Sequence, residues 1–407
     1  MQSVIPILWA GSVLGAGGLL VYWSIALVRM VRTLRGLPTI DDGIGWARQH
    51  PSPRSLAVIV PAHNESDTIA QTIDTLRRQT HEKLGIVLVL DRCTDDTEAI
   101  AREAIAGDDR FELMTVNECP AGWSGKIHAI DHAVRTSEHA RGCDSLLFVD
   151  ADAELDPEIA AGALALAERR ELDMLSLWST LAVRSWFDWL VQPACGIELA
   201  YQFPLLRANR DERRRAFANG QFILFDRAAY ERIGGHAAVN DEVFDDLALA
   251  RRASGHGLRL GAFLSGHRLR VNMYPSWTTF CRGWKRIYTD AAKRKVSRLR
   301  RAVWRNLLAG VVLPACGVLA VVLGMTPSVA ELGVLRWLGV SIALGGLLLW
   351  LGVLGELYRR GRFPLWAVPL HPLGVLINAG LLHAAGRDLT QGRPVKWGGR
   401  EYHLEPR

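Results

Sequence analysis

The sequence predicts an α/β domain with a largely parallel sheet, carried between transmembrane helices at the N-terminal and C-terminal ends of the chain. Short apolar runs alternate with helix-like segments from Ser55 onward, which is typical of a parallel sheet covered by helices. Long stretches without a charged side chain flank that region. Because 49% of the residues are apolar and 22% are charged, a disordered or collagen-like chain is excluded.

The four uncharged stretches are candidate membrane segments, since a helix needs about 20 apolar residues to cross a bilayer. They are 4–28, 306–330, 337–355 and 363–386. No basic residue precedes the first, and three arginines follow it between 29 and 35, a pattern typical of an uncleaved anchor rather than a signal peptide. The fourth holds three prolines in its first ten residues, which favours a broken or re-entrant segment but leaves a complete span possible.

Basic residues indicate the orientation of the chain in the membrane. Between Arg282 and Arg305 there are ten Lys or Arg and one Asp, a local charge of +9 in a chain of net charge +6. Because this run adjoins a hydrophobic stretch, anionic lipid head groups are favoured over nucleic acid as its partner. The positive-inside rule places residues 36–300 in the cytoplasm of a multi-pass protein of the cell (inner) membrane. The tail from Arg387 is inside only if the fourth stretch turns back.

The first half of the α/β region contains four strands and three helices. Apolar runs predict strands at 56–61, 85–91, 111–116 and 145–150, and helical spacing of apolar residues predicts helices at 66–79, 95–106 and 126–137. Ser66 is the expected N-cap of the first helix. Ligands of such sheets lie beyond the carboxyl ends of the strands.

Acidic residues follow three of these strands, in the segments PAHNES, DRCTDDT and DADAE. There is no G-x-G-x-x-G turn and no P-loop, which argues against a dehydrogenase or an NTPase. Repeated carboxylates at strand ends suit Mg²⁺ or Mn²⁺, which take oxygen ligands and bridge carboxylates to a substrate's phosphates. Asp150 and Asp152, with one residue between them, are the best candidates. A solvated acidic turn is the structural alternative.

Several segments occur together in an order that resembles a known family. They are VIVPAHNE, VLVLDRCTDDT, AGWSGK (121–126), FVDAD (148–152), ANGQFILFDRAAYERIGGHAAV (218–239) and FDDLALAR (244–251). As a set, covering roughly 56–290, they are similar to the membrane-bound family 2 glycosyltransferases. The resemblance implies a GT-A nucleotide-diphospho-sugar transferase domain, which is Rossmann-like. Within the family, the chain looks most like hopanoid-associated, carotenoid and ceramide glycosyltransferases.

The resemblance also implies donor-binding roles for individual residues. Pro61, Ala62 and Glu65 fall in the first nucleotide-binding loop of the family. Asp91 falls at the strand-end aspartate that binds the base, and Lys126 falls where a lysine approaches the nucleotide-sugar.

The acidic pairs receive metal-binding and catalytic roles. Asp150 and Asp152 match the D-x-D that holds Mg²⁺ or Mn²⁺, with Asp152 contacting the ion most directly. Asp246 matches the general base, and Asp245 is its neighbour at the substrate. The alternative is that both aspartates cap the helix that continues as LALARR. Two adjacent carboxylates raise one another's pKa, which suits a base.

Two features near the membrane have open interpretations. The segment 276–288 has the residue types of the family's Q/R-x-x-R-W in a different order, which counts against processive polymer synthesis. Trp284 within it either binds the acceptor or anchors at the membrane interface. The segment 184–217, rich in aromatics and then arginines, either lies on the membrane beside the site or forms a buried helix pair.

The expected function is an inverting, metal-dependent transfer of a sugar from a nucleoside diphosphate sugar, UDP above all, to a membrane lipid. The partners are then the nucleotide-sugar donor, the lipid acceptor and the membrane, with no nucleic acid. A processive polysaccharide synthase and a catalytically inactive membrane scaffold are the alternatives. The expected regions are an anchor (1–35), a cytoplasmic catalytic domain (54–275), a basic interfacial segment (276–305), a C-terminal membrane region (306–386) and a basic tail (387–407).

Overall fold

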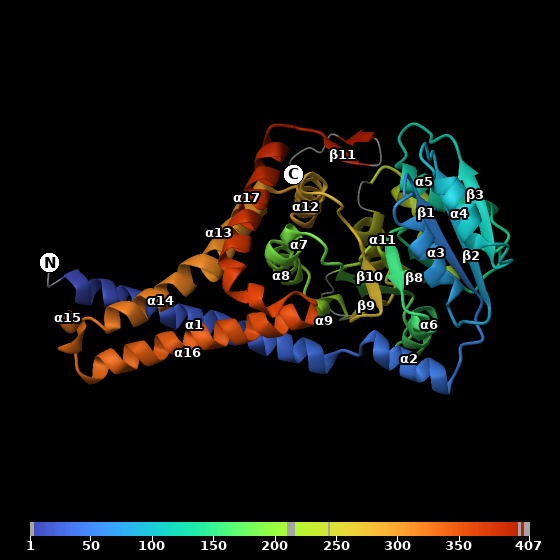
Figure 1. Cartoon of the computed structure of the whole chain (residues 1–407). Coiled ribbons are helices and arrows are strands. Elements are labelled where there is room, and N and C mark those ends of the chain that lie inside the picture. Colours follow the sequence, from blue (N-terminus) through green and yellow to red (C-terminus); the bar gives the residue numbers. More distant parts are fainter. Residues whose placement is uncertain (1–3, 210–215, 243–244, 398–399, 403–407) are drawn as a thin grey trace.

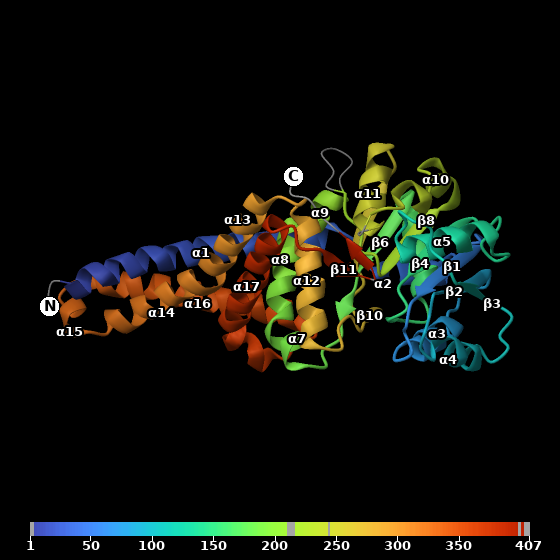
Figure 2. The same ribbon diagram turned by 90° about the horizontal axis from the view of Figure 1, so that it is seen from above.

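A computed structural model describes residues 4–209, 216–242, 245–397 and 400–402. An α/β domain occupies one end of the molecule, and a bundle of helices forms the other end (Figure 1). A layer of further helices lies between them, as the view from above also shows (Figure 2). The arginines expected at 210–215 lie outside the described residues.

The larger sheet has seven strands in the spatial order β3-β2-β1-β4-β8-β6-β9. The strands are β1 (Leu56–Ala62), β2 (Leu84–Asp91), β3 (Phe111–Val116), β4 (Ser145–Val149), β6 (Met174–Trp178), β8 (Phe222–Asp226) and β9 (Leu260–Leu264). Strand β8 runs antiparallel to β4 and β6, and the other neighbouring pairs are parallel. The prediction of a largely parallel sheet is confirmed.

Both faces of this sheet are covered by helices, so β1 is buried along its whole length. Val58 and Val60 pack into one core and Ala57 and Ile59 into another, because successive side chains of a strand point to opposite faces. The first face is covered by α2 (Ile40–Gln49), α3 (Ile69–Arg77), α4 (Thr97–Ile105) and α6 (Ile159–Arg169). The second is covered by α5 (Gly125–Thr136), α10 (Arg227–Arg232) and α11 (Asp245–Gly255).

The start of α3 differs from its prediction. The helix begins at Ile69 with Thr68 at the N-cap position, so the prediction of Ser66 as N-cap is wrong. The reason is tertiary: the Ser66 backbone N–H donates to Asp95 Oδ2 at 3.2 Å, which holds Ser66 in a loop.

The remaining strands form two small sheets. Strands β5 (Ala153–Leu155), β10 (Leu269–Val271) and β7 (Thr180–Leu181) pair in that order, and β11 (Val395–Trp397) pairs with β12 (Arg400–Tyr402). The Asn272 backbone N–H donates to the Asp152 carbonyl oxygen at 3.2 Å, so β10 fixes the turn that carries Asp152.

The bundle consists of α1 (Val4–Gly36), α14 (Leu313–Gly324) and α16 (Val334–Arg360). Small residues let these helices approach closely, with Ala16, Ala320 and Ala343 forming one buried cluster. Trp9 Nε1 donates to the Ala320 carbonyl at 3.1 Å, and a Cβ at Gly339 would lie 2.5 Å from the Trp9 ring.

The layer of helices between the bundle and the α/β domain is called the interface layer below. It consists of α7 (Trp186–Leu190), α8 (Gln192–Gln202), α12 (Trp277–Ala291), α13 (Val296–Leu307) and α17 (His371–Thr390), whose apolar faces share one core. Connecting elements complete the chain: α9 (Leu205–Ala208), η1 (His236–Val239), the π-helical η2 (Leu308–Val312), α15 (Pro327–Ala330) and η3 (Leu365–Leu370).

Among the residues that the structure describes, four helical segments are long and apolar enough to cross a membrane: Val4–Gln49, Val296–Gly324, Val334–Arg360 and Leu365–Thr390. They contain the predicted stretches 4–28 and 337–355 and overlap most of 306–330 and 363–386. The fourth is divided, because Pro364 and Pro369 confine residues 365–370 to a 3₁₀ helix before α17 begins. Helix α17 runs across the bundle rather than alongside it (Figures 1 and 2).

Candidate active site

The carboxyl ends of β2, β1 and β4 lie side by side at one edge of the larger sheet, because these strands are parallel neighbours. Pro61 and Ala62 are the last two residues of β1 and are buried. Asp91 ends β2, and Asp150 directly follows β4. The structure therefore brings the expected nucleotide loop, the expected base-binding aspartate and the D-x-D to one edge.

Asp91 is held by the residue that follows it. Arg92 donates from Nε to Asp91 Oδ1 at 2.8 Å and from Nη2 to Oδ2 at 2.7 Å. Arg92 has φ of 48°, a left-handed conformation that turns the chain sharply after β2. A Cβ at Gly125 would lie 2.2 Å from Arg92 Nη2 and 2.4 Å from Asp91 Oδ2, so a side chain at the start of α5 would displace this ion pair. Asp91 is 3% exposed as a result of this packing.

The loops after β1 and β2 are tied to one another. Asn64, with φ of 56°, accepts a hydrogen bond from the Thr94 backbone N–H at 2.8 Å. Asp95 accepts from the Ser66 N–H at 3.2 Å and from the Thr97 hydroxyl at 2.5 Å. These contacts order both loops around the edge where a nucleotide is expected.

The D-x-D lies beside Glu65 and Lys126. Lys126 Nζ is 2.7 Å from Asp150 Oδ1. Burial raises the pKa of Asp152 well above its usual value, and the negative charges of Asp150 and Glu65 raise it further. Burial also raises the pKa of Glu65, whose carboxylate accepts a 2.9 Å hydrogen bond from the Thr68 hydroxyl. The charges of Glu65, Asp150 and Asp152 thus influence one another.

Asp245 and Asp246 lie in the first turn of α11, within the helix rather than at its N-cap position. Lys126 Nζ lies 3.4 Å from Asp245 Oδ2, so one lysine contacts both acidic pairs. Asp246 Oδ2 accepts a 3.0 Å hydrogen bond from the Gly220 backbone N–H. The structure therefore joins the two acidic pairs, which are about a hundred residues apart in the sequence, into one site.

The surroundings of the two adjacent aspartates shift their pKa values in opposite directions. Burial and the neighbouring charge of Asp245 raise the pKa of Asp246 to about 7. Burial opposes the ionisation of Asp245 too, but the positive charge of Lys126 brings its pKa below the usual value. Burial lowers the pKa of His236 to about 4, so this imidazole is neutral at pH 7. Asp245 is then ionised while Asp246 titrates near neutrality, which suits a general base.

Helix α12 brings a further cation to the site but not the tryptophan. Arg286 interacts electrostatically with Asp246 and Asp245, and burial lowers the pKa of its guanidinium. Trp284 is 2% exposed and packs between Phe280 and Tyr288 in the core of the interface layer, not among the carboxylates. At that exposure Trp284 is not a surface anchor in the membrane interface.

The donor set fits a divalent cation of the Mg²⁺ or Mn²⁺ type, because Asp150 and Asp152 offer carboxylate oxygens, the kind of ligand that these ions prefer. Among the residues that the structure describes, no three His, Cys, Asp or Glu side chains converge on one ion position. Asp150 and Asp152 would therefore hold a cation together with oxygens supplied by the substrate.

The segment from residue 53 to residue 286, more than half of the chain, matches the family model described as glycosyltransferase like family 2. The chain belongs to this family. The prediction of a family 2 glycosyltransferase is therefore confirmed, and the protein is a glycosyltransferase with a GT-A type α/β domain.

Two curated relatives and two solved structures show what this glycosyltransferase is similar to. The 4,4'-diaponeurosporenoate glycosyltransferases of Staphylococcus aureus strains MRSA252 and bovine RF122 / ET3-1 are each 23% identical over 357 residues, covering 86% of this chain and 89% of theirs. The mannosyltransferase PcManGT from Pyrobaculum calidifontis, in complex with GDP-Man and Mn²⁺, is 17% identical with a TM-score of 0.43, over 88% of this chain and 99% of its own. S. aureus TarS 1–349, in complex with UDP-GlcNAc, is 14% identical with a TM-score of 0.39, over 86% and 96%.

Four residues of the glycosyltransferase site lie in segments that resemble the family, but their roles are not predicted by the sequence. Arg92 and Gly220 act through the geometry of their backbone and neighbours, and the contact of His236 with Asp245 is visible only in the fold. Arg286 lies in the altered Q/R-x-x-R-W region. The sequence there shows which residue types are present but not which side chain faces the site. Only the packing of α12 turns Arg286, rather than Trp284, toward the carboxylates.

Proposed function

We propose that the protein is an inverting glycosyltransferase that moves a sugar from a UDP-sugar to a hydroxyl group of a membrane lipid. The observation that carries this proposal is the position of the site against the interface layer. Arg251 of α11 pairs with Asp290 of α12 at 3.1 Å, and Lys285 of α12 pairs with Asp388 of α17 at 2.6 Å. Helix α11, whose first turn carries the candidate base Asp246, is thus linked through α12 to α17 in the membrane region.

The chemistry divides between the two ends of the site. When bound, Mg²⁺ or Mn²⁺ on Asp150 and Asp152 would offset the charge of the leaving diphosphate. The acceptor oxygen forms a bond to the anomeric carbon, the bond to the diphosphate oxygen breaks, and the diphosphate leaves with the electron pair. Asp246 takes the acceptor proton, and its pKa of about 7 suits that role. Asp245 keeps a negative charge beside Asp246 and holds Lys126 in the site.

The remaining donor contacts follow the edge of the sheet. In this proposal Pro61, Ala62 and Glu65 line the nucleotide loop, and Asp91 binds the base from its fixed position beside Arg92. The nucleotide is proposed as UDP because it is the commonest in the family.

A lipid acceptor is supported by the helices beside the site. Helices α7 and α8 pack against α17, while Trp186 is 47% exposed and Tyr201 is 44% exposed. Large exposed aromatics on helices next to a hydrophobic bundle suit contact with the membrane surface. The segment 184–202 is in this way partly a buried helix pair and partly an apolar surface. The curated relatives are named for a carotenoid, a long apolar molecule, which fits the same route.

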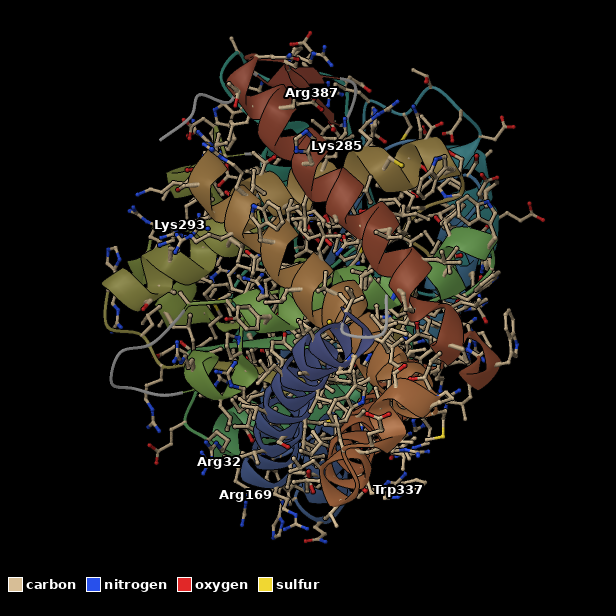
Figure 3. The ribbon with its side chains drawn as sticks, turned by 90° about the vertical axis from the view of Figure 1, so that its left-hand side faces the viewer. Arg32, Arg169, Lys285, Lys293, Trp337 and Arg387 are labelled. Atoms are coloured by element: carbon tan, nitrogen blue, oxygen red, sulfur yellow. The ribbon has the colours of Figure 1, made fainter. Side chains whose placement is uncertain are left out.

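The proposed topology has three crossings, a cytoplasmic catalytic domain (54–275) and a cytoplasmic tail. At the start of α17, His371 Nδ1 lies 3.2 Å from the Tyr358 hydroxyl, next to the basic end of α16. At its other end Asp388 pairs with Lys285, and Figure 3 shows Lys285 beside the part of α17 that carries Arg387. Both ends of α17 then lie on the side of the catalytic domain, which supports a segment that does not cross.

Transfer of radiolabelled sugar from a panel of UDP-sugars and GDP-sugars by purified protein in native lipid extract tests the function. Label in chloroform-extractable lipid is the expected result. Label in high polymer would instead indicate a processive polysaccharide synthase, against which the altered Q/R-x-x-R-W counts. The absence of transfer with every donor would indicate a catalytically inactive membrane scaffold.

A further inference from the structure

Lys126 forms a bridge between the two acidic pairs of the site. Its ammonium lies 2.7 Å from Asp150 Oδ1 and 3.4 Å from Asp245 Oδ2, and its side chain is 26% exposed. Lysine side chains are protonated at physiological pH, so this ammonium offsets part of the negative charge of the two acidic pairs.

The carboxylate of Asp150 is also one of the expected ligands of a divalent cation. Such a cation binds carboxylate oxygens at about 2.0–2.2 Å. An ammonium at 2.7 Å from Asp150 Oδ1 and a divalent cation on the same carboxylate would place two positive centres close together in a half-buried pocket. Occupation of Asp150 by Lys126 therefore opposes occupation by the cation.

The described side chains also leave the cation site incomplete. No three His, Cys, Asp or Glu side chains among them converge on one position, so Asp150 and Asp152 are a partial ligand set. A diphosphate group would supply both further ligands for the cation and another partner for Lys126. Its oxygens complete the coordination of the cation, and its negative charge offers Lys126 a new partner.

We propose that Lys126 is an internal counter-ion that occupies Asp150 while the donor is absent, so that a divalent cation binds tightly only together with the diphosphate of a nucleotide. The inference rests on the proposed metal-dependent function. It assigns to Lys126 a role in the order of binding, in addition to contact with the donor. By linkage, the factor by which the nucleotide tightens cation binding equals the factor by which the cation tightens nucleotide binding.

The test measures Mn²⁺ binding by the full-length protein in detergent, from the electron paramagnetic resonance signal of free Mn²⁺, with no nucleotide, with UDP and with GDP. Wild type should bind Mn²⁺ weakly alone and at least about tenfold more tightly with the matching nucleotide, within the usual range of coupling between sites. Lys126→Met should bind Mn²⁺ alone at least tenfold more tightly than wild type, with a smaller effect of the nucleotide. Lys126→Arg keeps the positive charge and should behave like wild type.

Lys83→Met is the matched control, because Lys83 is exposed and directly precedes β2, at the end of that strand opposite to Asp91. The control should leave all three binding constants unchanged. Equal Mn²⁺ affinity of wild type and Lys126→Met without nucleotide, with both variants binding the Mn²⁺–nucleotide complex, would overturn the role of Lys126 alone. A wild type that binds no Mn²⁺ even with UDP or GDP would overturn both this role and the proposed metal. The thermal unfolding midpoint of each variant confirms that the compared proteins are folded.

Discussion

The Gly220 backbone N–H donates a 3.0 Å hydrogen bond to Oδ2 of Asp246. Gly220 lies just before β8 in the middle of the larger sheet, whereas Asp246 lies in the first turn of α11. The sheet therefore orients the candidate base directly. A Cβ at Gly220 would lie 3.3 Å from the same oxygen, so this position also keeps side chains away from the carboxylate. The bond leaves Asp246 in a fixed rotamer, which is what proton transfer from an acceptor requires.

Asp246→Asn should abolish sugar transfer while leaving donor binding nearly intact. The substitution removes the proton acceptor but leaves the nucleotide loops and the D-x-D untouched. Nucleotide-sugar affinity and lipid transfer, measured on the same preparation, check this expectation. Normal transfer by the variant would move the base elsewhere, and loss of donor binding would make Asp246 a donor contact or a structural residue.

Asp152→Asn should lower turnover by at least about a hundredfold, the scale on which loss of one electrostatic stabiliser is felt. Unlike the change at the base, it should also weaken donor binding, and high Mn²⁺ should restore part of the activity. Asp74→Asn is the control, since Asp74 is an exposed carboxylate on α3 that pairs with Arg78. Full activity of Asp152→Asn, or of wild type in excess EDTA, would contradict the metal assignment.

The turnover number should fall as the pH is lowered through about 7. The reason is that burial and Asp245 raise the pKa of Asp246 to about 7, and only the ionised carboxylate accepts a proton. Asp245→Asn removes the adjacent negative charge, so the acidic limb of the profile should move to lower pH. A limb that stays in place in this variant would show that another group controls the profile.

Gly43→Ala should destabilise the packing of α2 on α6. A Cβ at Gly43 would lie 2.3 Å from the Gly162 carbonyl oxygen of α6, a clash with backbone that α2 relieves only by moving away. The expected loss is about 1–3 kcal/mol, the usual cost of overpacking. Thermal unfolding in detergent measures it. The neighbouring Gly45→Ala meets nothing within 4 Å and should be neutral or slightly stabilising; equal effects of the two changes would refute the packing argument.

A reporter that is active only in the cytoplasm should be active after residue 300, silent after residue 330 and active again after residue 407. The first two results follow from the basic residues around the first two spans. The third follows from the two ends of α17, which contact Tyr358 and Lys285 on the side of the catalytic domain. A silent fusion after 407 would make α17 a complete span, and a reversed pattern at 300 and 330 would place the catalytic domain outside.

The local pattern of the sequence determined the first four strands, the apolar segments and the position of the D-x-D. Strand β3 occupies the predicted residues 111–116, and β1, β2 and β4 differ from prediction by one residue at an end. These features are local in origin: an apolar run that becomes a buried strand needs no knowledge of its partners. The positions of Asp91 and Asp150 at the ligand-binding edge could be predicted as well, because the carboxyl ends of parallel strands lie at one edge of the sheet.

Contacts between segments that are distant in the sequence determined the features that no local pattern indicates. Serine is a residue type that favours the N-cap position. Ser66 nevertheless lies in a loop, because its N–H donates to Asp95, and α3 begins three residues later. Trp284 and Arg286 are two residues apart on one helix, so the packing of α12 on α17 sends one into the apolar core and the other toward the carboxylates. The bridge of Lys126 between Asp150 and Asp245 also exists only in three dimensions, because electrostatic contact depends on distance in space and not along the chain.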